Sequence, residues 1–234
     1  MFALWPGDQL NFSIFIKTTF GFAGQRAASE AGHIANTNVG CHYMKIERTI
    51  EKYYYLTGDE KSTVGNADPV DDKLSWDFFE NKDSSFKLSE PLRFKINEGR
   101  FSGTIGDYQF NSCGFLLFSN RLRTIFEKHL TDIDNPKWFD ARVIDLEDKE
   151  HNYSILYLFN KVDFLDHDKS TFVTGTDHPI KKRYDIDRIG DRLIYNSNTL
   201  GISLCIHDIV RKDIKKSDCS GLYFYKIHTA GRLV

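Results

Sequence analysis

The spacing of apolar residues predicts one clear helix near the middle of the chain. Ser119 is a favoured N-cap residue, and apolar side chains recur behind it with the 3.6-residue period of a helix. These apolar-face positions are Leu122, Ile125, Phe126, His129 and Leu130. Asn135-Pro136 then ends the element, because proline cannot continue a helix. A histidine on an apolar helix face is more typical of a buried structural residue than of a ligand.

A second helix is expected over residues 203–215. Its apolar positions fall on one face: Cys205, Ile206, Ile209, Val210 and Ile214. The following Lys215-Lys216 suit the negative end of a helix dipole. Gly221 then allows a turn into a closing strand over 222–225.

Alternating and continuous apolar runs predict further strands. Residues 91–96 alternate apolar and basic positions, which is typical of a strand with one wet face. Residues 153–159 are apolar on both faces apart from Ser154, so this strand should be central in its sheet. Other strands are expected at 137–145 and 192–195, and turn formers predict a loop over 57–72 with an Asp68-Pro69 turn. The pattern as a whole predicts an α+β fold, in which a mixed or mainly antiparallel sheet is packed by a few helices.

Residues 1–43 differ from the rest of the chain. They hold only four charged residues and are rich in small residues from Gly21 to Gly40, which is a poor pattern for a helix or an amphipathic strand. We therefore expect an atypical N-terminal extension over 1–43, which could lie upstream of the natural start at Met44, and a folded domain over 44–234. The alternative is that 11–19 forms a real edge strand.

Composition narrows the class of partner. The chain has 31 Lys and Arg against 33 Asp and Glu, for a net charge of −2. Nucleic-acid binders concentrate basic residues, so no nucleic-acid partner is expected. No run of about 18 apolar residues is present, so no membrane partner is expected. The four cysteines lack metal-site spacing, and we interpret them as thiols in a reducing, cytoplasmic compartment.

No motif supports catalysis strongly, so no catalytic, cofactor-binding or metal-binding residue is predicted. The chain lacks a GxSxG elbow, an HExxH pair and a phosphate-binding loop. The alternative is a hydrolase that uses Cys113 with a distant histidine, or an Asp-rich metal site. Acidic candidates for the metal site are Asp163, Asp166 and Asp168, followed by Asp185, Asp187 and Asp191. A third hypothesis is a structural or regulatory module of a larger assembly.

Several short segments occur in the order found in a known family. They are an aromatic opening at 53–55, then 111–114 leading into 118–122, 152–157, 160–166 closed by 169–170, and 219–224. The set resembles the eleventh numbered group of bacterial polymorphic-toxin immunity proteins, over roughly residues 44–228. The segment around 205–208 departs from the family pattern, since Cys205, His207 and Asp208 stand where Glu, Lys or Leu is expected.

The resemblance implies a protein that binds and neutralises a cognate toxin by occlusion. It implies no cofactor and carries over no catalytic residue. The matched positions are Gly114, Ser119, Leu122, Asp163, Ser170 and Gly221, and we expect them to be structural. The toxin-facing residues and the oligomeric state are left open.

Overall fold

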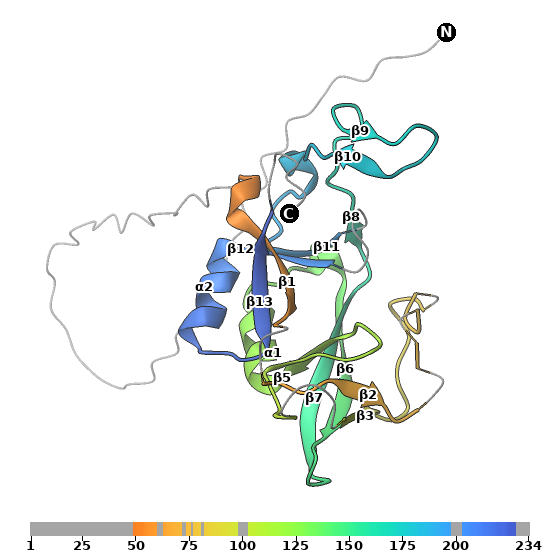
Figure 1. Ribbon diagram of the computed structural model, residues 1–234, viewed down its shortest axis with the longest axis vertical. Helices are drawn as coiled ribbons and strands as arrows, with labels where there is room; N and C mark the ends of the chain where they lie inside the picture. Colours follow the sequence, from red (N-terminus) through yellow and green to blue (C-terminus); the bar gives the residue numbers. More distant parts are fainter. Residues whose placement is uncertain are drawn as a thin grey trace, which may run out of the picture. The chain divides into compact units, whose positions relative to one another are not determined.

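The computed structural model describes residues 49–59, 63–71, 74–75, 77–80, 82–97, 103–197 and 203–227. The expected extension 1–43 and the alternative strand at 11–19 therefore lie outside the described residues. Within the described part there are two α-helices, α1 (Asn120–Glu127) and α2 (Asp208–Lys216), and thirteen strands. Three short 3-10 helices accompany them: η1 (Ile50–Lys52), η2 (Asp132–Asp134) and η3 (Ile186–Arg188). The predicted α+β class is confirmed (Figure 1).

One sheet has six strands in the order β2-β3-β6-β7-β5-β4. The strands are β2 (Ala67–Pro69), β3 (Leu92–Ile96), β4 (Tyr108–Gln109), β5 (Leu116–Ser119), β6 (Pro136–Ile144) and β7 (Glu150–Leu158). The pair β3–β6 is parallel, and the other neighbours are antiparallel. The central position predicted for the strand at 153–159 is confirmed, because β7 lies between β6 and β5.

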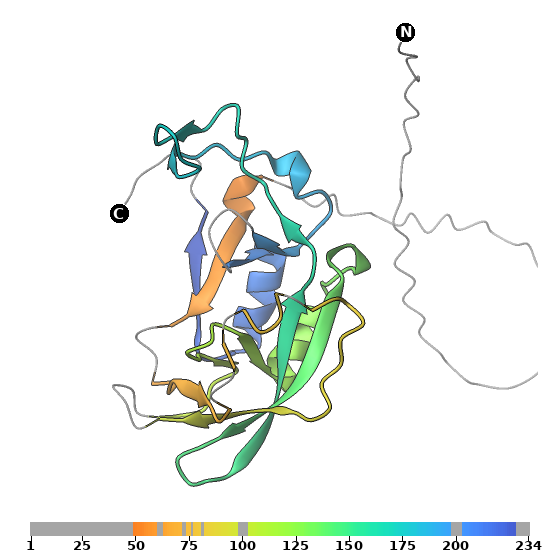
Figure 2. The same ribbon diagram turned by 90° about the vertical axis from the view of Figure 1, so that its right-hand side faces the viewer.

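The other large sheet has five strands in the order β13-β1-β12-β11-β8. The strands are β1 (Tyr53–Gly58), β8 (Lys161–Val162), β11 (Ile194–Ser197), β12 (Ser203–His207) and β13 (Leu222–Lys226). All neighbours are antiparallel except β11 and β8. A separate two-stranded hairpin is formed by β9 (Thr171–Phe172) and β10 (Pro179–Lys181). It lies at the opposite end of this unit from the β6–β7 turn (Figures 1 and 2).

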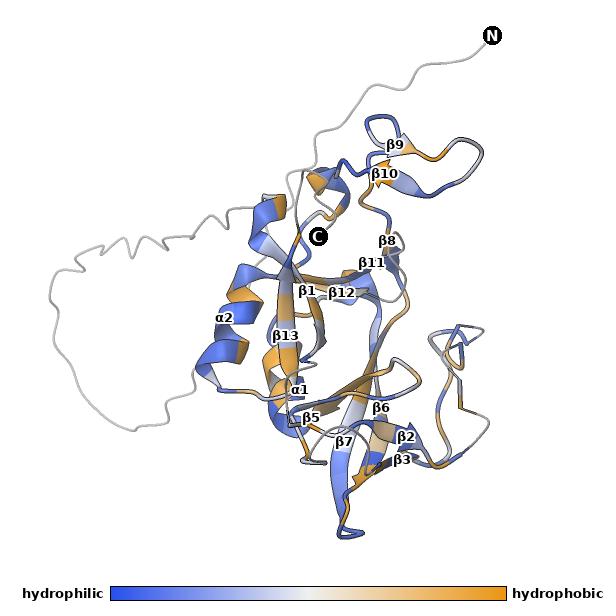
Figure 3. Cartoon of the chain, in the orientation of Figure 1, coloured by the Kyte–Doolittle hydropathy of each residue, from blue (hydrophilic) through white to orange (hydrophobic). Residues whose placement is uncertain are grey.

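The largest apolar cluster joins both sheets to both helices. Leu56 and Ile206 enter it from the five-stranded sheet, and Phe118 and Leu156 enter from the six-stranded sheet. The inner faces of the helices are apolar and their outer faces hydrophilic (Figure 3). A second cluster lies on the other face of the six-stranded sheet, and a third lies around Tyr53 and Cys205. The cluster that the two sheets share makes their packing interdependent.

The expected helix over 203–215 is wrong in its first five residues. Residues 203–207 form β12, which pairs with β1 on one side and β11 on the other. Helix α2 begins only at Asp208, where the side chain of His207 accepts the amide hydrogen of Ile209 at 3.3 Å as the N-cap. An apolar pair such as Cys205-Ile206 fits either a helix or a buried strand, and pairing with two neighbouring strands decided between them.

The expected Asp68-Pro69 turn is also wrong. Both residues lie in β2, at one edge of the six-stranded sheet. Proline is tolerated in such a position because an edge strand leaves one row of backbone groups without a strand partner. The turn-forming character of this segment was therefore a poor guide to its conformation.

Candidate functional site

A buried carboxylate joins the two large sheets. Asp107, which directly precedes β4, is 8% exposed. Its Oδ1 accepts hydrogen bonds from Ser119 Oγ at 2.7 Å and from Arg121 Nε at 3.0 Å. Its Oδ2 accepts from the Ser220 amide at 2.9 Å and from Arg121 Nη2. We call these four residues, Asp107, Ser119, Arg121 and Ser220, the Asp107 clasp.

Each member of the Asp107 clasp is placed by an element that begins beside it. Ser119 ends β5 and caps α1, so its Oγ also accepts the Leu122 amide hydrogen at 3.2 Å. Arg121 lies in the first turn of α1. Ser220 precedes β13, and its carbonyl oxygen accepts the Tyr108 amide hydrogen at 3.1 Å. The clasp thus ties the start of α1 and the loop before β4 to the start of β13.

Gly221 permits the close approach that the Asp107 clasp requires. Its φ is +82°, in the left-handed region that favours glycine. A Cβ at this position would also fall well inside contact distance of the Tyr108 carbonyl oxygen. Any larger residue would therefore push β13 away from β4.

The electrostatics of the Asp107 clasp favour an ionised carboxylate. Burial alone would raise the pKa of Asp107, but hydrogen bonds from Arg121, Ser220 and Ser119 outweigh it and hold the pKa below its usual range. The hydrogen bond to Asp107 in turn raises the pKa of the Arg121 guanidinium. The carboxylate is therefore held as a charged acceptor by fixed donors, which suits a structural joint better than proton transfer.

An open depression of about 440 Å³ lies beside the Asp107 clasp. Asn120, Arg121, His151 and Asn152 contribute polar side chains to its wall. His151 is held there by Asp145, with Nε2 and Oδ2 at 2.7 Å. These groups offer hydrogen bonds to a macromolecular surface. The Ser119 hydroxyl already donates to Asp107, whose lowered pKa makes it a poor general base.

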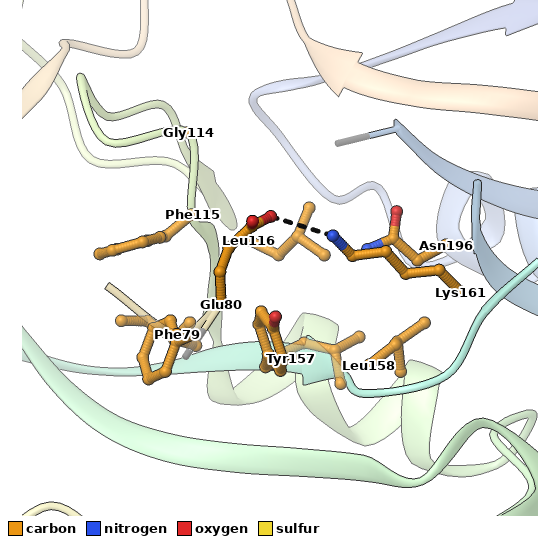
Figure 4. A pocket seen from close by; sticks show the side chains of 11 residues that line it. Phe79, Glu80, Gly114, Phe115, Leu116, Tyr157, Leu158, Lys161 and Asn196 are labelled. Atoms are coloured by element: carbon orange, nitrogen blue, oxygen red, sulfur yellow. Dashed lines mark hydrogen bonds and ion pairs between the residues drawn. The ribbon is translucent and has the colours of Figure 1, made fainter. Parts of the chain in front are cut away.

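A second hollow is more enclosed and much smaller (Figure 4). Its walls are mainly apolar, with Phe79, Phe115 and Leu158 among them, and Glu80 and Lys161 form an ion pair at 3.0 Å across it. The free volume is about 20 Å³, which is enough for about one water molecule. This hollow is too small for an organic substrate.

The hydrolase alternative depends on Cys113, whose thiol is buried and so is not accessible to a substrate. The side chain is 4% exposed, and its Sγ contacts the carbonyl oxygen of Leu74 at 3.6 Å. Burial raises the pKa of this thiol, which disfavours the reactive thiolate. Within the described ranges no group of three or more His, Cys, Asp or Glu side chains could hold a metal ion. Neither version of the enzyme alternative gains support from this geometry.

The sequence matches the Immunity protein family (Imm11) over residues 29–229. The chain belongs to this family. The match begins before Met44 and ends within the C-terminal segment that follows β13. No curated protein matches the chain. Neither helix of the described residues has the length and apolar character of a membrane-spanning helix.

Two of the predicted positions of this Imm11 protein meet at one place. Ser119 is a member of the Asp107 clasp, and Gly221 directly follows its member Ser220. Leu122, fully buried, lies one helical turn from Ser119. Segments that are far apart in the sequence, 118–122 and 219–224, are therefore brought together by Asp107.

The other three positions of the Imm11 chain lie elsewhere. Gly114, with φ at +70°, belongs to a turn in which Asn111 exchanges two hydrogen bonds with Phe115. Asp163 accepts the Leu165 amide hydrogen at 3.1 Å and contacts His167. Ser170 exchanges hydrogen bonds with the backbone of Arg183, at 2.9 and 3.2 Å. These contacts organise the turn before β5 and the excursion that carries β9 and β10.

Asp107 itself was missed by sequence reasoning. It stands alone in the sequence between Gly106 and Tyr108, without a charged neighbour to suggest a site. Its partners are 12, 14 and 113 residues away, so no local spacing could reveal them. His129, in contrast, is satisfied as expected, by Asp213 Oδ2 at 2.8 Å.

Proposed function

We propose that this Imm11 protein binds a cognate bacterial toxin and neutralises it by occlusion. The observation that carries the proposal is membership of the immunity family over residues 29–229. Occlusion needs a rigid surface and no chemistry of its own. The Asp107 clasp supports this reading, because its charged groups bond to one another and hold two sheets together.

The proposed complex is a stable one between two proteins in the cytoplasm of the protected cell. A specific interface of this kind buries about 1,200–2,000 Å² and requires no cofactor. The net charge of −2 gives no long-range preference for a strongly basic or acidic toxin. Specificity would therefore come from shape and from local patches of charge.

The direct test is expression of the toxin encoded beside this gene, with and without the immunity protein. We expect growth to be rescued only when the cognate protein is present, and we expect the two proteins to co-purify at equal stoichiometry. A toxin from an unrelated system provides the control, since occlusion depends on a matched surface. Loss of growth despite confirmed expression of this chain would exclude the proposed function for that pair.

A further inference from the structure

The two large sheets have four edges, and they differ in how well they resist pairing with another strand. In the described residues β8 and β4 have two residues each, and β2 has three, one of which is Pro69. Short strands and proline are the usual protection of a sheet edge. Strand β13 has five residues, Leu222–Lys226, without proline or a register shift. It is the edge best suited to accept an added strand.

The register of β13 shows which of its backbone groups point outward. The Ile227 amide donates to the Tyr53 carbonyl oxygen, and the Asp59 amide donates to that of Gly221, each at 3.1 Å. In an antiparallel pair these hydrogen-bonded positions alternate. The backbone groups of Tyr223 and Tyr225 therefore point toward β1, and those of Leu222, Phe224 and Lys226 point away from it.

The side chains of β13 differ between its two faces. Leu222 and Phe224 pack against the apolar cluster shared by the sheets. Tyr223 and Tyr225 are 44% and 54% exposed, and their ring centroids are 4.5 Å apart. Tyrosine is enriched at protein interfaces because it offers a large, rigid contact area and a polar end. Among the described strands β13 has no outer neighbour, so this exposed pair has the character of an interface anchor.

A groove of about 350 Å³ lies between β13 and the C-terminal half of α2. Arg211 and Lys215, one helical turn apart, contribute two positive charges to its rim, and Asp218 contributes one negative charge. Arg211 also binds Asp208 at 2.6 Å. The rim is therefore positive at Lys215, which favours acidic side chains in whatever occupies the groove.

We propose that β13 is the docking edge for the toxin, and that an extended toxin segment pairs with it as an added strand and places acidic side chains near Lys215. This inference rests on the proposed function and names the surface that performs it. The segment would hydrogen bond to the outward backbone of Leu222, Phe224 and Lys226, while Tyr223 and Tyr225 cover it from one side.

A second copy of this chain is the less favoured occupant. Two-fold pairing of β13 with itself would keep both α2 helices on the same face of the joined sheet. The positive rims at Lys215 would then approach each other, whereas an acidic partner would neutralise them.

The first test measures toxin affinity by calorimetry with the full-length protein and the toxin encoded beside it. The double variant Tyr223→Ser/Tyr225→Ser should weaken binding by about 100-fold, as expected for loss of two anchor residues. The matched control is Val173→Ser/Ile180→Ser on the β9–β10 hairpin, since these residues are 44% and 59% exposed. The control should change the affinity by less than about threefold. Equal effects of the two double variants would overturn the proposal.

The second test separates the backbone from the side chains. Lys226→Pro removes one outward amide without removing a hydrogen bond to β1, and proline is tolerated in edge strands at such positions. We expect about a tenfold loss of affinity.

Lys215→Glu should also weaken binding about tenfold, and this loss should depend on the salt concentration. The matched control is Lys216→Glu, which lies outside the groove, makes the same change in net charge and should have little effect on affinity. If Lys215→Glu and Lys216→Glu weaken binding equally, the groove is not the acidic contact.

The third test identifies the occupant of the edge. Amide hydrogen exchange at Leu222, Phe224 and Lys226 should be fast in the free protein and slow in the toxin complex. Slow exchange in the free monomer would show that the chain covers its own edge. A free dimer that Lys226→Pro converts to a monomer would identify a second copy. Either result overturns the docking proposal while rescue of growth by the unmodified protein would leave the proposed function standing.

Discussion

The β6–β7 hairpin differs in construction from the joint at β13, by which we mean the Asp107 clasp together with Gly221. The hairpin is local: nine residues pair with nine across a short turn, and Asp145 accepts the amide hydrogens of Glu147 and Lys149 at 2.9 Å within that turn. The joint is distant: Asp107 and Ser220 are 113 residues apart. A local hairpin tolerates change at its exposed tip, because each contact there is small. The joint concentrates the connection between two sheets in a few positions.

Gly221 should be the most sensitive position in this comparison. Gly221→Ala combines a left-handed backbone with a close contact to the Tyr108 carbonyl oxygen, so we expect a loss of about 3 kcal/mol or more in the free energy of unfolding. Chemical denaturation measures it. Gly175→Ala is the matched control, because Gly175 has φ at +77° but no heavy atom near the added Cβ. We expect it to cost about 1 kcal/mol. Similar losses at both glycines would mean that the contact with β4 is unimportant.

Asp107→Asn should come next, at about 2 kcal/mol near neutral pH, because it removes a buried charge that several donors share. The pKa of Asp107 is lowered in the folded protein, so the unfolded chain binds more protons between that pKa and the ordinary value of 3.8. The stabilisation from this carboxylate is thus present above the ordinary pKa of 3.8, and it is lost as the pH falls through the lower pKa of the folded protein.

The pH dependence provides a separate check on Asp107. Unfolding free energies measured from about pH 6 to pH 3 should fall less steeply in Asp107→Asn than in the unmodified protein. Parallel curves would show that another carboxylate, such as Asp208, whose pKa is also lowered, is responsible for the acid sensitivity.

Ser119→Ala should cost about 1–2 kcal/mol, measured by the same denaturation. The change removes both the N-cap of α1 and one donor to Asp107. Thr124→Ala is a useful control on the same helix, because its hydroxyl donates only to the Asn120 carbonyl oxygen and is exposed. An effect at Ser119 no larger than at Thr124 would count against a role for the cap in the joint.

The smallest effect is expected at the tip of the hairpin. Lys95 and Asp148 form an ion pair at 2.8 Å, but their side chains are 55% and 76% exposed. Lys95→Ala should therefore change the free energy of unfolding by less than about 0.5 kcal/mol. A loss near that of Ser119→Ala would remove the contrast between the tolerant hairpin and the sensitive joint.

The sequence predicted elements whose signal is local. The capped helix after Ser119, the strand at 91–96, the central strand at 153–159 and the closing strand after Gly221 all follow from periodicity and turn chemistry. The segment at 203–207 was assigned incorrectly, because two strands distant in sequence determine its conformation. The position of β13 at the edge of its sheet could not be predicted either, since strand order is not encoded in periodicity.

In this Imm11 protein, local patterns in the sequence were enough to predict the fold class, the family and the Ser119 cap of α1. Only the folded chain reveals that Asp107 joins Ser119, Arg121 and Ser220, and that β13 lies at an edge with two exposed tyrosines. The difference comes from the distance along the chain over which each interaction acts. Capping and amphipathic period act within a few residues, whereas a buried carboxylate and a sheet edge depend on which distant segments are folded against each other.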